Sequence, residues 1–283
     1  MITIIISNMK QKTLVLVTLL IAFSSFAQNI PEKINESDFS IGKTVQIKSA
    51  ILKEDRTLNI YFPTSYYINN SKKYPVIYLL DGSKDEDFIH IAGIVQFGSF
   101  PWINMLPEAI VVGIGNVDRK RDFTYPSTLE IDQKEFPTSG KSKKFIQFLK
   151  KELLPFINTN YRTTDNKTLI GQSLGGLLAT EVLFKTPNLF NNYIIVSPSL
   201  WWDAEKLLTF APAKYNTKKH IYIAVGKEGP VMERTAKELY NKLLGKATEN
   251  SKIYFEFLED KTHGDALHEA VYNAFEKMFK VEK

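Results

Sequence analysis

One stretch of this chain restricts its fold more than any other, the segment "TLIGQSLGGLLAT" at residues 168–180. It places three glycines between apolar flanks, although glycine weakens both strands and helices. The flank before the glycines predicts a strand, and the flank after them predicts a helix. Gly171 and Gly175 permit a very sharp turn between the two, because larger side chains there would collide across it. The segment therefore predicts a strand–turn–helix unit that raises Ser173 above the edge of a sheet.

Short apolar runs elsewhere predict the rest of that sheet. Segments 43–51 and 56–62 predict a hairpin. The later runs cover 74–82, 109–116, 167–173, 191–199, 220–228 and 252–260, and helical patterns lie at 142–157, 174–186, 232–244 and 266–279. Runs buried on both faces are typical of parallel strands, so the alternation predicts an α/β fold, a mostly parallel central sheet with helices on both faces. Residues 117–141 show no period, and a loop of that length is expected to be functional or mobile.

The first 27 residues predict a secretory signal peptide. Lys10 and Lys12 precede an apolar run at 13–26 with small residues near its end, and Ala27 follows. A membrane anchor is the alternative, but the run is shorter than the roughly 20 residues that a spanning helix needs. We therefore expect cleavage near Ala27 and one catalytic domain over 28–283, secreted or periplasmic and without membrane attachment after cleavage.

Composition supports a globular domain and argues against some partners. The chain is 44% apolar and 12% aromatic, which is typical of a protein with a packed core. It has no cysteine, so the core must stabilise the domain without disulfides. Loss of the two leader lysines lowers the formal net charge from +5 to +3, and no basic stripe is present. We expect no nucleic-acid partner.

The position of Ser173 predicts nucleophilic catalysis. Serine attacks only where a base takes its proton, and in a sheet of this kind the order along the chain is serine, acid, histidine. His263 lies in "EDKTHGD", between the last predicted strand and the last helix, and is the predicted base. Glu228 follows the preceding strand by two residues and is the predicted acid. The less favoured candidates are His90, His220 and His268 for the base, and Asp203, Glu233, Glu259 and Asp260 for the acid.

An oxyanion hole requires two donors near the nucleophile. The N–H of Leu174 is the first candidate, because it follows Ser173 at the start of a helix. The second is expected from the loop after "VIYLLDG", at Gly82 or Ser83.

With these residues placed, the chain resembles the putative-esterase family of α/β hydrolases, whose members include ferric-enterobactin and salmochelin esterases and bacillibactin trilactone hydrolases. The resemblance covers about residues 43–280 and rests on "YPVIYLLDG", "RKRDFTYP" (119–126), "FLKKELLPFINTNYR", "TLIGQSLGGL", "SPSLWW" (197–202), "AVGKEG" (224–229) and "THG" (262–264). It implies the α/β-hydrolase fold and the triad Ser173, Glu228 and His263. It also implies that Arg121, Trp201 and Trp202 contact substrate.

These observations lead to one expected function and three alternatives. We expect a secreted serine ester hydrolase that forms an acyl-enzyme and cleaves a small-molecule trilactone siderophore. The alternatives are a carbohydrate acetyl or feruloyl esterase, an acyltransferase of the same fold, and a non-catalytic binding protein, against which the complete triad argues. No cofactor and no metal are expected, since His263, Asp265 and His268 lack the H-E-x-x-H spacing.

Overall fold

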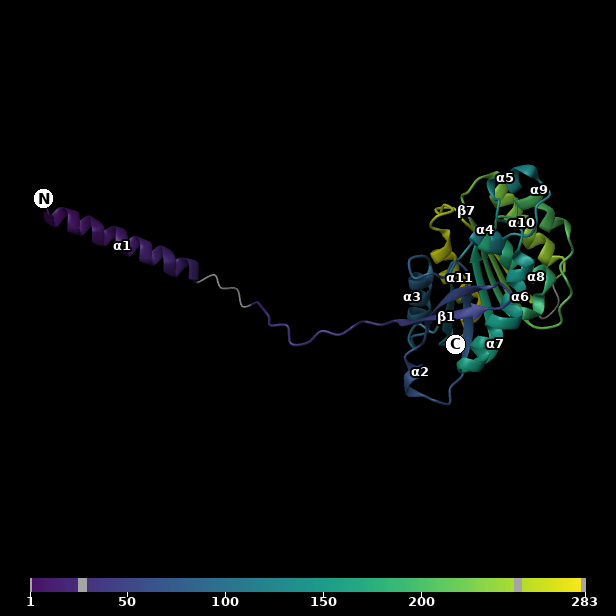
Figure 1. Cartoon of the computed structure of the whole chain (residues 1–283), viewed down its shortest axis with the longest axis horizontal. Coiled ribbons are helices and arrows are strands. Elements are labelled where there is room, and N and C mark those ends of the chain that lie inside the picture. Colours follow the sequence, from purple (N-terminus) through teal and green to yellow (C-terminus); the bar gives the residue numbers. More distant parts are fainter. Residues whose placement is uncertain (1, 25–29, 247–250, 281–283) are drawn as a thin grey trace. The chain divides into compact units, whose positions relative to one another are not determined.

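The computed structural model describes residues 2–24, 30–246 and 251–280, which form two units, Met1–Ser40 and Ile41–Lys283 (Figure 1). In its described residues, 2–24 and 30–40, the first unit contains one helix, α1 (Ile2–Ser24). Among the described residues, no helix combines the length and the apolar character that crossing a membrane requires. Ala27, the expected cleavage point, lies outside the described residues, so the boundary after residue 27 stays a prediction.

The second unit is built on one sheet. Its strands are β1 (Gly42–Ser49), β2 (Glu54–Tyr61), β3 (Tyr74–Leu79), β4 (Ile110–Ile114), β5 (Thr163–Gln172), β6 (Asn192–Val196), β7 (Lys219–Gly226) and β8 (Ser251–Leu258). They lie in the order β1-β2-β4-β3-β5-β6-β7-β8. β2 pairs antiparallel with β1 and β4, and every pairing from β4 through β8 is parallel. Each predicted strand is present within a few residues of its expected bounds.

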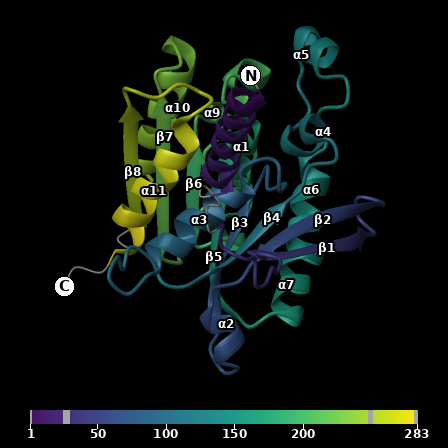
Figure 2. The same cartoon turned by 90° about the vertical axis from the view of Figure 1, so that its left-hand side faces the viewer.

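Helices cover both faces of the sheet. They are α2 (Ser65–Ile68), α3 (Phe88–Gly98), α4 (Arg119–Phe123), α5 (Glu130–Glu135), α6 (Ser142–Phe148), α7 (Leu154–Asn160), α8 (Leu174–Lys185), α9 (Trp202–Thr209), α10 (Pro230–Leu244) and α11 (Ala266–Phe279), with a π-helical turn at Leu149–Leu153 and a 3-10 turn at Pro187–Leu189. Buried side chains of the sheet form one core with α6, α8 and α10 and a second core with α3 and α11. Figure 2 shows the helices α3 and α11 together on one side of the strands. In β3, Val76 and Tyr78 face the first core, while Ile77 and Leu79 face the second.

Two local differences from the sequence-based prediction have physical causes. The helix expected over 142–157 widens into the π-helical turn before α7, where Pro155 has no N–H to donate to the preceding turn. The loop expected over 117–141 contains α4 and α5, which are too short to show a helical period.

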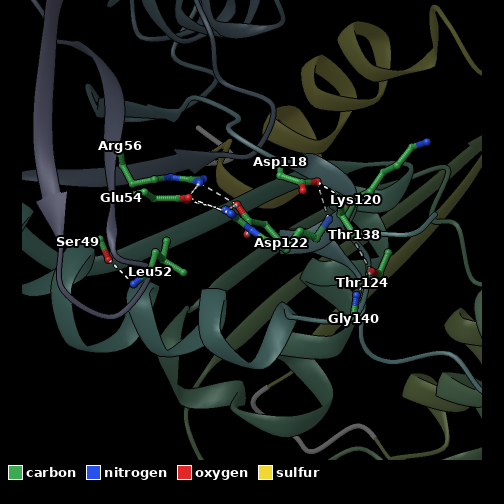
Figure 3. A network of polar contacts seen from close by, with 11 residues as sticks. Ser49, Leu52, Glu54, Arg56, Asp118, Lys120, Asp122, Thr124, Thr138 and Gly140 are labelled. Atoms are coloured by element: carbon green, nitrogen blue, oxygen red, sulfur yellow. Dashed lines mark hydrogen bonds and ion pairs between the residues drawn. The ribbon is translucent and has the colours of Figure 1, made fainter. Parts of the chain in front are cut away.

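A buried ion cluster joins β2 to α4 (Figure 3). Arg56 is fully buried, and its Nη1 lies 2.8 Å from both Glu54 Oε1 and Asp122 Oδ2. Arg121 donates to the same two carboxylates, at 2.6 Å to Glu54 and 2.7 Å to Asp122. Burial alone would raise the pKa of Glu54, but the hydrogen bonds from Arg121 and Arg56 hold that pKa below its ordinary value.

We predict that Glu54→Gln destabilises the fold in a pH-dependent way. Because the pKa of Glu54 is lowered by folding, its contribution is present above the unfolded pKa and is lost as pH falls through the folded pKa. Urea unfolding at neutral pH should show a loss of about 2 kcal/mol that shrinks below about pH 4.

The control for this experiment is Asp55→Asn on the same strand. The Asp55 carboxylate is 65% exposed and lies 3.9 Å from Lys48, so its removal should change the free energy of unfolding by no more than about 0.5 kcal/mol. Equal losses in the two variants, or a loss for Glu54→Gln that is the same at every pH, would contradict the prediction.

Candidate active site

Ser173 lies in a strained turn between β5 and α8. Its φ of 58° and ψ of −121° are unfavourable for a residue with a side chain. A Cβ on Gly171 would lie 2.4 Å from the carbonyl oxygen of Gly175, so the turn can form only if position 171 lacks a side chain. The Ser173 N–H donates to the Val196 carbonyl at 3.1 Å, which fixes the turn against the end of β6.

Glu228 and His263 form a hydrogen-bonded pair. Glu228 follows β7 and His263 lies between β8 and α11, and the distance from His263 Nδ1 to Glu228 Oε2 is 2.6 Å. The Glu228 side chain is 2% exposed, whereas that of His263 is 48% exposed. Burial would raise the pKa of Glu228, but hydrogen bonds from His263, the Ser197 hydroxyl and the Gly226 N–H hold it below its ordinary value. The carboxylate is therefore charged and able to orient the imidazole.

Two further hydrogen-bond sets hold this pair in place. Glu233 Oε1 accepts the backbone N–H groups of Glu228 and Gly229 at 3.0 and 2.9 Å, at the start of α10. The Gln172 side-chain amide donates to the His263 carbonyl at 2.5 Å. The residue before the nucleophile thus ties the histidine loop to the turn.

Ser173 and His263 line the same cavity of about 430 Å³. Its other described lining residues are Asp81, Glu86, Asp87, Arg119, Gln172 and Gly264. The volume lies in the range usual for small-molecule sites. Burial, with the negative charges of Asp81 and Glu86 nearby, raises the pKa of Asp87 to about 6. The described residues contain no group of three or more His, Asp or Glu side chains placed to hold a metal ion.

The arginine at this cavity is Arg119, which the sequence analysis did not single out. Its guanidinium binds Asp81 with two hydrogen bonds of 2.6 and 3.0 Å and approaches the Gln172 carbonyl at 3.3 Å. Arg121, expected to contact substrate, instead turns to Glu54 and Asp122. Residues two apart on a helix lie about 200° apart around its axis, so only one of these arginines can face the cavity. The sequence shows both arginines but not which face of so short a helix is buried.

Trp201 and Trp202, also expected to contact substrate, are not among the described residues that line the cavity. Trp202 is fully buried, and its indole N–H donates to the Tyr125 carbonyl at 2.8 Å. Trp201 is half-buried and packs against Phe136 and Trp202. Trp202 therefore has no surface to offer a substrate and stabilises the core, while a contact from Trp201 stays a prediction.

The three N–H groups expected to form the oxyanion hole, those of Gly82, Ser83 and Leu174, differ in their hydrogen bonding in the structure. The Gly82 N–H already donates to the Ile114 carbonyl at 3.1 Å, so it is committed to the sheet rather than directed at the cavity. The Ser83 N–H donates to the Glu86 carboxylate at 3.2 Å, and Glu86 lines the cavity. Leu174 begins α8, where N–H groups lack partners within the helix. The Ser83 N–H can reach an oxyanion only where the substrate oxygen replaces the Glu86 carboxylate, whereas the Gly82 N–H would have to leave the sheet. On that condition Leu174 and Ser83 stay the predicted pair.

We predict that Gly171→Ala abolishes the turn while an equivalent change elsewhere is harmless. The new Cβ would lie 2.4 Å from the Gly175 backbone, which cannot yield without opening the turn, so the variant should lose at least about 3 kcal/mol of stability and the predicted ester hydrolysis. Thermal unfolding and a chromogenic ester assay measure both effects.

Gly93→Ala is the matched control, because the residue lies inside α3 and, apart from its chain neighbours and the adjoining helix backbone, nothing lies within 4 Å of its added Cβ. It should keep activity and gain about 0.5–1 kcal/mol from helix propensity. An active, stable Gly171→Ala variant would show that the close approach of residues 171 and 175 is not required.

Comparison with known proteins places this geometry among esterases. A family model described as "Putative esterase" matches residues 49–279. The ferri-bacillibactin esterase BesA of Bacillus subtilis is 31% identical over 213 residues, which cover 67% of this chain and 73% of the relative.

Two solved structures share the fold. An IroE-like serine hydrolase from Shewanella oneidensis superposes with a TM-score of 0.75 at 28% identity, covering 84% of this chain and 80% of the other. The BES protein from Bacillus cereus superposes with a TM-score of 0.76 at 25% identity, covering 89% and 100%. Together with the strand order, these matches confirm the predicted α/β-hydrolase fold.

Proposed function

Because the chain belongs to the Putative esterase family and is a carboxylic-ester hydrolase, we propose that it cleaves siderophore lactone esters with Ser173, His263 and Glu228 as a catalytic triad. The observation that carries this proposal is the 2.6 Å hydrogen bond between His263 and the buried Glu228, with His263 opening onto the cavity that Ser173 lines. Such a pair is the arrangement that activates a serine.

The chemical steps follow from these positions. Ser173 Oγ attacks the ester carbonyl carbon while His263 Nε2 takes the hydroxyl proton, and Glu228 stabilises the imidazolium. The N–H groups of Leu174 and Ser83 stabilise the oxyanion. The C–O bond breaks, His263 returns the proton to the leaving alcohol, and an acyl-enzyme remains. Water, deprotonated by His263, then attacks the acyl carbon. The bond from that carbon to Ser173 Oγ breaks, His263 returns the proton to Oγ, and the acid leaves.

The substrate class is taken from the relatives. BesA is named as an esterase of ferri-bacillibactin. The cavity beside Ser173 has room for one arm of a branched lactone, and the Arg119 guanidinium can stack on an aromatic ring or donate a hydrogen bond to an anionic oxygen. We therefore propose a trilactone with catecholate arms as substrate.

We predict that only the wild-type chain opens such a trilactone. Residues 28–283 and the Ser173→Ala variant are incubated with a triscatecholate trilactone, iron-free and iron-loaded, and with acetylated and feruloylated oligosaccharides, and products are identified by mass spectrometry. The wild type should yield linear trimer and monomer, and Ser173→Ala should be at least about 1,000-fold slower because the nucleophile is lost.

Each other outcome assigns a different function. Release of acetate or ferulate would move the substrate to polysaccharide esters. Capture of the acyl group by dilute added alcohol would indicate an acyltransferase. Full cleavage by Ser173→Ala would refute the serine mechanism, and binding without cleavage by the wild type would indicate a binding protein.

We also propose that residues 1–27 are a secretory signal peptide and that the catalytic domain acts in the periplasm or outside the cell. The support is the order of Lys10, Lys12 and the apolar run at 13–26. When the full chain is expressed in a bacterium with a secretory pathway, intact mass should place the new N-terminus at Gln28. Recovery of the chain with residues 1–27 attached would contradict this proposal.

A further inference from the structure

Two serines after β6 touch two members of the proposed triad. The strand ends at Val196, and Ser197-Pro198-Ser199 then runs alongside the turn that carries Ser173. Ser197 is fully buried and Ser199 is 2% exposed. Neither serine belongs to the proposed triad or oxyanion hole, and both lie in "SPSLWW", whose tryptophans are the residues expected to contact substrate.

Ser197 fixes one oxygen of the acid. Its hydroxyl donates to Glu228 Oε1, which also accepts the Gly226 N–H at 2.9 Å. The other oxygen, Oε2, is thereby left to His263. Ser197 has a φ of 45°, a conformation that serine rarely adopts, and its N–H donates to the Ala224 carbonyl at 2.8 Å. The backbone is thus held in an unfavourable conformation that directs the hydroxyl at Glu228.

Ser199 contacts the nucleophile itself. Its N–H donates to the Ser173 carbonyl at 3.0 Å, and its Oγ lies 3.3 Å from Ser173 Oγ. Ser199 therefore makes hydrogen bonds to both the backbone and the hydroxyl of Ser173. With the Ser199 hydroxyl as donor, the Ser173 proton remains available to His263.

We propose that Ser197 and Ser199 are positioning residues of the esterase site, Ser197 for the Glu228 carboxylate and Ser199 for the Ser173 hydroxyl. The proposal rests on the triad proposed above. Because the two serines act on different triad members, their removal should leave different kinetic signatures.

The Ser197 hydroxyl influences how readily the site is protonated. Without the Ser197 hydroxyl, the Glu228 carboxylate loses one of its hydrogen-bond donors. The negative charge of the carboxylate is then less stabilised by neighbouring dipoles, and it attracts the protonated His263 imidazole more strongly. The protonated imidazole is the inactive form, because it cannot take the serine proton. The fall of kcat/KM at low pH, its acid limb, should therefore move to higher pH. Removal of the Ser199 hydroxyl leaves every donor to Glu228 in place and should not move that limb.

Other charged groups lie in the segments around this pair, and the serine substitutions leave them unchanged. They are Glu233 on α10, Lys227 next to Glu228 in the chain, Lys261 paired with Glu269 at 3.0 Å, Asp265, which accepts the Thr262 N–H, and Asp81, Glu86, Asp87 and Arg119 at the cavity. Asp87 also titrates near the acid limb, since its pKa is raised to about 6. The Ser197 comparison is therefore repeated in an Asp87→Asn background.

The test measures kcat and KM of p-nitrophenyl acetate hydrolysis from about pH 5 to 9 for Ser197→Ala, Ser197→Gly, Ser199→Ala and Ser142→Ala. Glycine accepts a φ of 45°, so Ser197→Gly removes the hydroxyl while keeping the backbone. Ser142 is the matched control, because it is fully buried and its hydroxyl has no hydrogen-bond partner among the described residues.

Both Ser197 variants should lower kcat/KM about 10-fold and raise the midpoint of the acid limb by about half a pH unit, with or without Asp87. Ser199→Ala should lower kcat about 3-fold to 10-fold at an unchanged midpoint and KM. Ser142→Ala should match the wild type.

Several outcomes would overturn the proposal. A Ser197→Gly profile that overlays the wild type refutes the role of Ser197, and Ser199→Ala with wild-type kcat refutes that of Ser199. A midpoint shift that disappears in the Asp87→Asn background would assign the effect to the cavity carboxylate instead. Failure of the triad itself is seen separately, as Ser173→Ala with wild-type activity.

Discussion

The close approach of Gly171 to Gly175 is the constraint on which the site depends. It allows β5 to reverse into α8 within the single residue Ser173, at a backbone conformation that costs about 1–3 kcal/mol. A second approach accompanies it, because a Cβ on Gly176 would lie 2.9 Å from Pro198 Cα. Without a side chain at position 176, the segment after β6 comes near enough for Ser199 to reach Ser173. The glycines thus place two neighbouring strand ends in contact.

The parallel sheet then brings the remaining groups to the same edge. β5, β6, β7 and β8 are successive neighbours, and their carboxyl ends lead to Ser173, to Ser197 and Ser199, to Glu228 and to His263. Ligand sites form at this edge in open α/β sheets. Hydrogen bonds across it, from Gln172 to the His263 carbonyl and from Ser197 to Glu228, join loops that are far apart in the sequence.

The sequence predicts those parts of the structure that depend on local pattern. Apolar runs give the strands of the sheet, and the spacing around Ser173 gives the turn. The sequence does not predict which side chains and N–H groups point into the cavity. Arg121 and Arg119 are indistinguishable until the buried face of α4 is known, and the Gly82 N–H is committed only because β4 lies beside its loop. The sequence resemblance predicts Trp202 as a substrate-binding residue, whereas in the structure its indole N–H donates a hydrogen bond to the Tyr125 carbonyl inside the core.

Ser197 contributes little to the free energy of folding, because its backbone strain offsets its hydrogen bond to Glu228. A positive φ on serine costs about 1–3 kcal/mol, whereas a hydrogen bond to a charged carboxylate contributes about 1.5–3 kcal/mol. The two effects nearly cancel, so the residue contributes little net free energy to folding. Glycine there would relieve the conformation and lose the hydrogen bond, again with little net effect on stability. The strain at position 197 is therefore better explained by the alignment of Glu228 than by the stability of the fold.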